Sequence, residues 1–189
     1  MRYRDRIDAG RALAANLRAE GFGASELEPI VLGVARGGVT VAAPVAREFD
    51  AALGVVVARK LGAPGNPELA IGAIGKSGEA FVDDELARRL RVTPEYLDAE
   101  IERQRRRIVE RVERYGVGVD EPDYATYEVA VVDDGVATGA TLIAALRSVR
   151  AASPGRLICA VPVGPPETLR RLEREADAVV CPNRPAMFA

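Results

Sequence analysis

The feature of this sequence that most restricts its fold is a series of short apolar runs alternating with helical patterns. The runs that read as strands are residues 29–34, 53–58, 68–74, 127–132, 157–163 and 178–181. Continuous apolar character, without polar residues at every second position, indicates strands buried on both faces. We therefore predict an α/β fold with an open, mostly parallel twisted sheet flanked by helices, which binds ligands beyond the carboxyl ends of its strands.

The helical patterns lie between these runs, over residues 39–49, 93–115, 139–151 and 165–175. The dipeptide Thr93-Pro94 is a typical helix start, with Thr as the N-cap and Pro at the first helical position. The length of 189 residues fits one domain over 1–189, with a core of about 28–164 and a long helical insert of about 83–115.

Composition excludes several classes of function. The chain has no histidine, which rules out a Ser-His-Asp triad, a Cys-His pair and a His-containing zinc site. A net charge of -2, and glutamates interleaved with the arginines of 102–114, argue against a nucleic-acid partner.

No apolar run reaches the roughly 18 residues of a membrane span, and the charged start lacks a signal-peptide core, so we expect a cytoplasmic protein without a membrane partner. Cys159 and Cys181 lie in apolar runs and are predicted to be buried free thiols.

The loop after Val132 carries the strongest functional signal. Asp133 and Asp134 follow the apolar run, and then come Gly135, Val136, Ala137, Thr138, Gly139, Ala140 and Thr141 before a helix. Two carboxylates can accept hydrogen bonds from a diol, while small residues let a phosphate approach the free N–H groups of a helix start. An Asp-Asp-Gly turn or a Thr cap alone has an ordinary structural explanation, but the continuous string favours a ligand site.

Two other loops offer positive charge. Ala35, Arg36, Gly37 and Gly38 follow the first strand and suit a multiply charged anion, although an ordinary Gly-rich turn explains them equally well in isolation. Arg59 and Lys60 end the second strand and open a Gly- and Pro-rich loop over 61–67. They could equally be a charged strand end. Only Lys60 and Lys76 are lysines among 26 basic residues, which is a mild sign of a chemical role.

The string from Val129 to Thr141 closely resembles the phosphoribosyl-pyrophosphate signature of type I phosphoribosyltransferases. The resemblance extends from about residue 30 to 181 and is closest to stand-alone bacterial members of undefined substrate. It implies that Asp133 and Asp134 hold the ribose hydroxyls and that 135–141 hold the 5-phosphate. It also implies that 35–38, Arg59 and Lys60 bind pyrophosphate, with a non-proline cis peptide near Ala35–Arg36 and a mobile loop over 61–76.

The resemblance further implies transfer of phosphoribosyl from phosphoribosyl pyrophosphate to a nucleobase-like acceptor by a homodimer. Asp133, Asp134, Arg36, Arg59 and Lys60 would be the catalytic residues. Mg²⁺ would be held mainly by the substrate and would reach the two acids through water. A C-terminal hood of about 162–189 would contribute the base pocket, but no residue stands out as the base-side proton carrier.

Two departures from the family leave the acceptor open. Ala137 stands where hypoxanthine- and xanthine-type enzymes usually carry Asp, which makes a 6-oxopurine a less expected substrate. The sequence ends at 185–189, where close relatives continue into an aromatic-rich tail, so either the tail is absent or the chain is truncated.

Other functions fit parts of the sequence. A non-catalytic phosphoribosyl-pyrophosphate-binding regulator is the main alternative, although no helix-turn-helix segment is present and Arg59-Lys60 favours turnover. Another phosphate-binding α/β protein or a hydrolase is the third reading. A haloacid-dehalogenase nucleophile requires a second acid at 135, where this chain has Gly.

Overall fold

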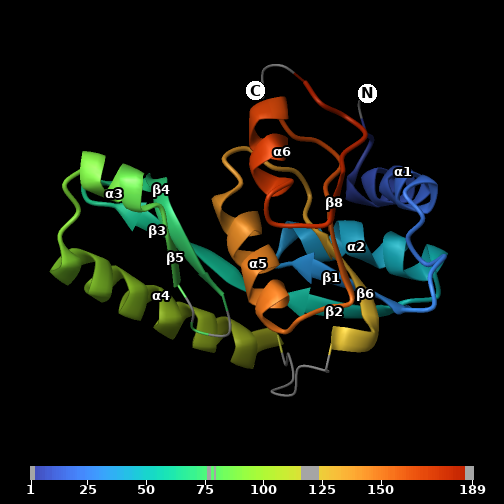
Figure 1. Cartoon of the computed structure of the whole chain (residues 1–189), viewed down its shortest axis with the longest axis horizontal. Coiled ribbons are helices and arrows are strands. Elements are labelled where there is room, and N and C mark those ends of the chain that lie inside the picture. The colour runs from blue at the N-terminus through green and yellow to red at the C-terminus, as the bar shows by residue number, and fades with distance from the viewer. Residues whose placement is uncertain (1–2, 76–77, 79, 116–123, 186–189) are drawn as a thin grey trace.

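The computed structural model describes residues 3–75, 78, 80–115 and 124–185, without the side chains of 68 and 111–115. Its centre is a sheet of five strands in the order β2-β1-β6-β7-β8 (Figure 1). Every neighbouring pair in this sheet is parallel, which confirms the predicted fold class. The strands are β1 (Glu28–Val34), β2 (Ala52–Val56), β6 (Tyr127–Val132), β7 (Arg156–Ala160) and β8 (Ala178–Val180).

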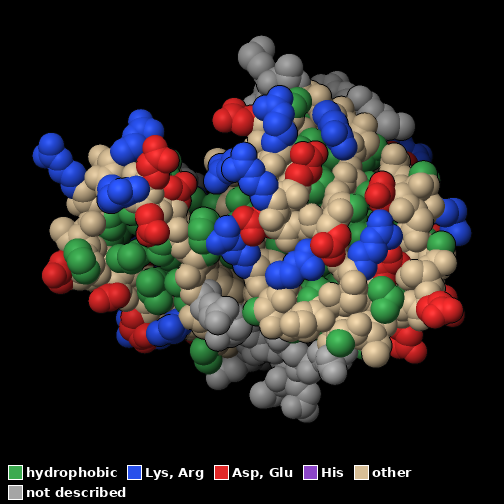
Figure 2. All heavy atoms as spheres, in the orientation of Figure 1, with side chains coloured by type: hydrophobic (Ala, Val, Ile, Leu, Met, Phe, Trp, Pro, Cys, Tyr) green, Lys and Arg blue, Asp and Glu red, His purple; other side chains and the backbone are tan. Residues whose placement is uncertain are grey.

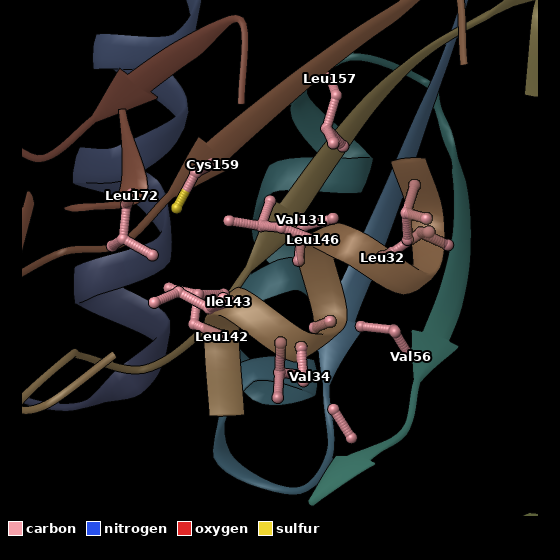
Figure 3. Packing of buried hydrophobic residues seen from close by; sticks show 14 of the residues in the cluster. Leu32, Val34, Val56, Val131, Leu142, Ile143, Leu146, Leu157, Cys159 and Leu172 are labelled. Carbon is pink, nitrogen blue, oxygen red and sulfur yellow. The ribbon is translucent and has the colours of Figure 1, made fainter. Parts of the chain in front are cut away.

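Helices cover both faces of this sheet. On one face, α1 (Arg6–Ala19) and α2 (Gly37–Glu48) pack on a cluster that includes Val31, Ala130 and Val132. On the other face, α5 (Ala140–Ala151) and α6 (Pro166–Leu172) pack on alternate residues of the same strands. Figure 3 shows Val131 beside Leu146 at the centre of this second face and Leu172 beside Cys159, and all four belong to one buried cluster with Leu32 and Leu142. Strands buried on both faces explain the continuous apolar runs.

A second, antiparallel sheet contains residues that the sequence analysis assigned to the parallel sheet. It has the order β3-β4-β5 and consists of β3 (Ala58–Ala63), β4 (Asn66–Gly75) and β5 (Ala80–Val82). The predicted strand over 53–58 therefore stops at Val56, and the run 68–74 does not join the parallel sheet. In Figure 1 this sheet forms a lobe beside the main one, together with α3 (Asp84–Arg89) and α4 (Pro94–Tyr115).

The prediction of a loop over 61–67 is wrong, because most of this segment belongs to the two strands of a β-hairpin. Only Pro64 and Gly65 turn the chain, and Gly65 has the positive φ of 73° that such a turn requires. Leu61 of β3 and Ile71 of β4 are completely buried in the lobe. Burial against α4 and cross-strand pairing outweigh the Gly and Pro content that suggested a loop.

The long helix is confirmed as α4, and Thr93 Oγ1 caps it by accepting from the N–H of Tyr96 at 3.3 Å. Its apolar residues Leu97, Ile101 and Ile108 pack in the lobe, whereas the side chains of Val112 and Tyr115 lie outside the described residues. The exposed Arg105 and Arg106 pair with Glu102, which agrees with a solvated face.

Three smaller observations complete the fold. A 3₁₀ turn, η1 (Tyr124–Thr126), leads into β6, and the sequence analysis did not predict α1. Cys159 and Cys181 are buried free thiols, as predicted. Within the part of the chain that the structure describes, no helix is both long and apolar enough to cross a membrane.

Candidate functional site

The acid pair Asp133-Asp134 lies directly beyond the carboxyl end of β6. The N–H of Asp133 donates to the carbonyl of Ala160 at 3.2 Å, which ties the first acid to β7. The N–H of Asp134 donates to Asp133 Oδ1 at 2.8 Å. Because β6 is the central strand of the sheet, both carboxylates lie at the middle of its carboxyl edge.

The loop after β1 meets this acid pair. A Cβ atom at Gly38 would lie 2.5 Å from the carbonyl oxygen of Val132 and 2.9 Å from Cα of Asp133, and a Cβ atom at Gly37 would overlap the carboxylate of Asp134. Glycine is therefore required at position 38, where the neighbouring atoms are backbone, whereas a side chain at position 37 would have to displace the Asp134 carboxylate. The predicted non-proline cis peptide between Ala35 and Arg36 is confirmed, and the Arg36 side chain is exposed.

The segment 135–141 forms a turn whose carbonyl groups are directed to α6. Thr168 Oγ1 donates to the carbonyl of Ala137 at 2.6 Å, and Arg171 Nη1 donates to the carbonyl of Thr138 at 3.3 Å. In a trans peptide the N–H points opposite to the C=O, so the N–H groups of residues 138 and 139 point away from α6.

The start of α5 is open to an anion. Gly139 occupies the N-cap with a φ of 82°, a conformation that suits glycine. Among the described residues, no group accepts a hydrogen bond from the N–H of residues 138–141. Thr138 is exposed and Thr141 is partly exposed. These N–H groups at the positive end of a helix dipole can bind a phosphate, which is the geometry the signature predicted.

The predicted cations Arg59 and Lys60 stand on β3, in the smaller sheet. Arg59 Nε donates to Gln104 Oε1 of α4 at 2.6 Å. Among the described residues, no hydrogen bond or ion pair joins either cation to the acid pair. The far end of the predicted mobile loop, Lys76, lies outside the described residues.

Burial changes the acidity of Asp133. It raises the pKa of this carboxyl from its ordinary value of 3.8 to about 7, and the negative charge of Asp134 adds to the increase. The N–H of Asp134 and the positive charge of Arg6 act in the opposite direction. Burial also raises the pKa of the neighbouring Cys159 thiol, so this sulfur stays protonated. Asp133 therefore changes charge near neutral pH.

This acidity predicts a pH-dependent stability. The pKa of Asp133 is higher in the folded state than in the unfolded chain, so between about pH 4 and pH 7 the folded protein holds the extra proton. The free energy of unfolding should therefore fall as the pH rises through this window, by at most about 1.4 kcal/mol per pH unit. Urea unfolding of the wild type and of Asp133→Asn should show this slope only in the wild type. Parallel curves would contradict the raised pKa.

Arg6 is a site residue that the sequence analysis missed. Its Nε and Nη2 atoms both donate to Asp134 Oδ2, at 2.8 and 2.7 Å, although the two residues are 128 positions apart. Beside this pair lies a cavity of about 580 Å³, lined among others by Tyr3, Thr40 and Asp134. The only local signal was a helix start, in which Asp5 Oδ1 accepts from the N–H of Asp8, and nothing in the sequence linked that helix to the acids.

The smaller sheet packs on α5 through β3 and β4, and a groove lies beside this contact, between β5 and the α5–α6 pair. Figure 2 shows arginines gathered on the α5 and α6 side of this hollow. One cavity in it, of about 260 Å³, reaches Thr138 and Ala140 at the start of α5. Of the predicted base-binding segment 162–188, Arg171 lines this cavity, while residues 186–188 lie outside the described residues.

Comparison with known proteins identifies relatives over the full chain. A family model described as a phosphoribosyl transferase domain matches residues 2–188. A protein named as a phosphoribosyl transferase in two strains of Mycobacterium tuberculosis is 41% identical over 186 residues. The match covers 98% of this chain and 41% of the relative, so the chain spans about two fifths of the length of these curated relatives.

Similar solved structures share the fold of this chain. The crystal structure of TT1426 from Thermus thermophilus is 45% identical, with a TM-score of 0.82 over 100% of this chain and 88% of that one. A purine phosphoribosyltransferase from Pyrococcus horikoshii has 19% identity and a TM-score of 0.51, over 97% and 84% of the two chains. A hypoxanthine phosphoribosyltransferase from Staphylococcus aureus has 12% identity and a TM-score of 0.53, over 96% and 76%. The last two likenesses are of fold.

Proposed function

This chain belongs to the phosphoribosyl transferase domain family, and from that premise we propose that it transfers 5-phosphoribosyl from phosphoribosyl pyrophosphate to a nucleobase or a related N-heterocycle. The observation that carries the proposal is the meeting of three loops at one edge of the sheet: the acid pair, the loop 35–38 and the anion-binding start of α5. We treat residues 1–189 as one functional unit.

Each part of the substrate has a matching group in this proposal. Within 135–141, the 5-phosphate binds the N–H groups of 138–141 and the hydroxyls of Thr138 and Thr141, where the helix dipole favours negative charge. The N–H of Val136 is not available, because it donates to the carbonyl of Val163 at 2.9 Å. The ribose hydroxyls donate to the carboxylates of Asp133 and Asp134. The pyrophosphate lies along 35–38, beside the exposed guanidinium of Arg36. The close approach of Gly37 to the carboxylate of Asp134 supports this order, because sugar and pyrophosphate bound in this way would lie side by side.

The reaction exchanges one bond at the ribose C1 atom. The C1–O bond to pyrophosphate breaks, its electron pair leaves with the pyrophosphate oxygen, and a ring nitrogen of the acceptor forms the new C1–N bond. Positive charge develops on the sugar during this exchange, close to the carboxylates that hold its hydroxyls. Catalysis then comes mainly from positioning and fixed charges.

Arg59 and Lys60 are proposed to add positive charge at the leaving group when the smaller sheet closes on the site. Both residues stand on β3, which pairs with β4 and packs on α4. In this arrangement the closing element is a hairpin with a supporting helix, in place of an isolated loop. Such closure would exclude water and prevent hydrolysis of the substrate.

The donor set of the site fits Mg²⁺ bound largely through the substrate. Asp133 and Asp134 offer the oxygen ligands that Mg²⁺ prefers, and this ion usually takes its other ligands from phosphate and water. Within the described residues, no group of three or more Asp, Glu, Cys or His side chains could hold a metal ion alone. When bound, Mg²⁺ neutralises charge on the leaving pyrophosphate. The two acids would orient it through water.

The acceptor is restricted by one position. Ala137, whose carbonyl accepts a hydrogen bond from Thr168, has no polar side-chain group that could hydrogen-bond to a base nitrogen, which disfavours a 6-oxopurine.

The family resemblance also suggests a homodimer.

A panel of nucleobases with phosphoribosyl pyrophosphate and Mg²⁺, read out as pyrophosphate release, tests the proposed function. We expect release that depends on one class of acceptor. If the protein binds phosphoribosyl pyrophosphate tightly but releases no pyrophosphate with any acceptor, the proposal of an enzyme is rejected in favour of a non-catalytic regulator. Absence of binding would reject both.

A further inference from the structure

An ion pair joins the N-terminal helix to the acid pair. Arg6 directs two N–H donors at one oxygen, Asp134 Oδ2, and among the described residues Asp134 Oδ1 has no hydrogen-bond partner. The Arg6 side chain is 59% exposed and that of Asp134 is 33% exposed. Ion pairs this exposed contribute little to stability. The stability of the fold therefore does not explain why this pair lies at the site.

The helix that carries Arg6 is firmly docked. Leu13 and Leu17 of α1 are completely buried, and Gly10 lies so close to α2 that a Cβ atom there would meet the Val41 carbonyl oxygen and Pro44. Before the helix, the Tyr3 hydroxyl donates to the carbonyl of Pro162 beyond β7 at 3.1 Å. The helix that carries Arg6 is therefore held in place by packing on α2, and this fixes the position from which Arg6 contacts Asp134.

The negative charges of the proposed substrate would be repelled by the carboxylates of Asp133 and Asp134. Two adjacent carboxylates must receive a ligand with several phosphate charges, and Asp134 lies against Gly37 of the pyrophosphate loop. Like charges at this separation repel one another. Arg6 places a positive charge directly on the carboxylate nearest that loop. It leaves one oxygen of the same carboxylate for a sugar hydroxyl.

We propose that Arg6 is a positioning residue of the phosphoribosyl-pyrophosphate site: it anchors Asp134 through Oδ2, turns Oδ1 to the ribose hydroxyls and offsets the charge of the acid pair as the anionic ligand arrives. This inference rests on the proposed function. A cavity of about 580 Å³ beside the pair, lined among others by Arg6, Thr40 and Asp134, keeps the pair accessible.

Binding of phosphoribosyl pyrophosphate with Mg²⁺, measured by calorimetry from about pH 6 to 9, tests this role in Arg6→Gln and Arg6→Lys. Arg4→Gln is the matched control, because Arg4 stands two residues earlier and pairs with Asp8 at 3.1 Å in an exposed ion pair away from the acids. We expect Arg6→Gln to weaken binding about tenfold, the loss of one charge-assisted contact. Arg6→Lys should recover part of this loss, and Arg4→Gln should match the wild type.

The pH profile separates positioning from a merely structural effect. Groups that face the acid pair are Arg6 from α1 and Cys159 from β7, besides the two acids themselves. Loss of Arg6 removes the fixed positive charge that contacts Asp134, so the pH dependence of binding should change in Arg6→Gln and stay unchanged in Arg4→Gln.

Each outcome decides the inference. Equal affinity and equal pH profiles of Arg6→Gln and wild type would overturn the role of Arg6 and leave the proposed function intact. Failure of the wild type itself to bind would reject the proposed function and this inference with it. If Arg6→Gln does not fold, the Arg6→Lys variant tests the inference. An affinity and a pH profile intermediate between those of the wild type and Asp134→Asn would support the positioning role. Wild-type values of both in Arg6→Lys would contradict it.

Discussion

Simultaneous replacement of Asp133 and Asp134 with Asn should lower kcat/KM for phosphoribosyl pyrophosphate by about 10³-fold. Each substitution converts a charged acceptor into a neutral one of similar shape, and a hydrogen bond to a charged group is worth roughly 1.5–3 kcal/mol. Two such losses amount to about 3–6 kcal/mol, and each 1.4 kcal/mol changes the rate tenfold. Steady-state kinetics with the acceptor identified by the base panel would measure the effect.

The fold should survive this double substitution. Asn at 133 removes a carboxyl whose pKa burial raises to about 7, so thermal unfolding at pH 8 should show no loss of stability from that position. Asp98→Asn, an exposed position on α4, is the matched control and should retain wild-type kinetics. Wild-type kcat/KM in the double variant would reject the assignment of the two acids.

Gly38→Ala should reduce the affinity for phosphoribosyl pyrophosphate by about 100-fold. Alanine suits a helix better than glycine, so propensity alone would favour this change at the second residue of α2. The new Cβ, however, would lie 2.5 Å from the Val132 carbonyl oxygen and 2.9 Å from Asp133 Cα, both backbone atoms. Relief of this overlap must move the pyrophosphate loop away from the acid pair, and a displacement of about 1 Å can cost 10²-fold. Calorimetric titration would measure the loss.

Gly155→Ala provides a control for the packing cost. A Cβ atom there would lie 2.7 Å from the Ala125 carbonyl oxygen, so overpacking of about 1–3 kcal/mol is expected at both sites. Gly155 precedes β7 at the amino edge of the sheet, opposite the candidate site. Both variants should therefore lose stability in urea, while only Gly38→Ala loses affinity. Equal affinities would show that the contact between the two loops does not serve binding.

Much of the central layer could be predicted from the sequence, because its signals are local. An apolar run such as 127–132 is typical of a strand buried on both faces, as in a parallel sheet, and ligands of such sheets bind beyond the carboxyl ends of the strands. The acid pair, the Gly-Gly loop and the open helix start are contiguous motifs. Their presence next to strand ends indicated where the site lies before any coordinates.

The smaller sheet shows where local signals fail. The segment 61–67 is predicted as a loop because it is rich in Gly and Pro, yet only residues 64–65 turn. Whether Leu61 and Ile71 form strands depends on their burial under α4, which begins only at Pro94. Strand propensity is settled by such partners and not by the segment alone.

The sequence by itself determined most of the central sheet and its covering helices, the edge of the sheet where a ligand site is expected, and the turn that is proposed to bind phosphate. Each of these depends on residues adjacent in the chain. Only the tertiary structure decided that the hairpin carries Arg59 and Lys60, and that Arg6 reaches Asp134 across 128 positions. The physical reason is that these contacts follow from how α1 packs on α2 and how α4 packs on the hairpin. Side-chain packing between distant elements leaves no periodic or motif-like trace in a single sequence.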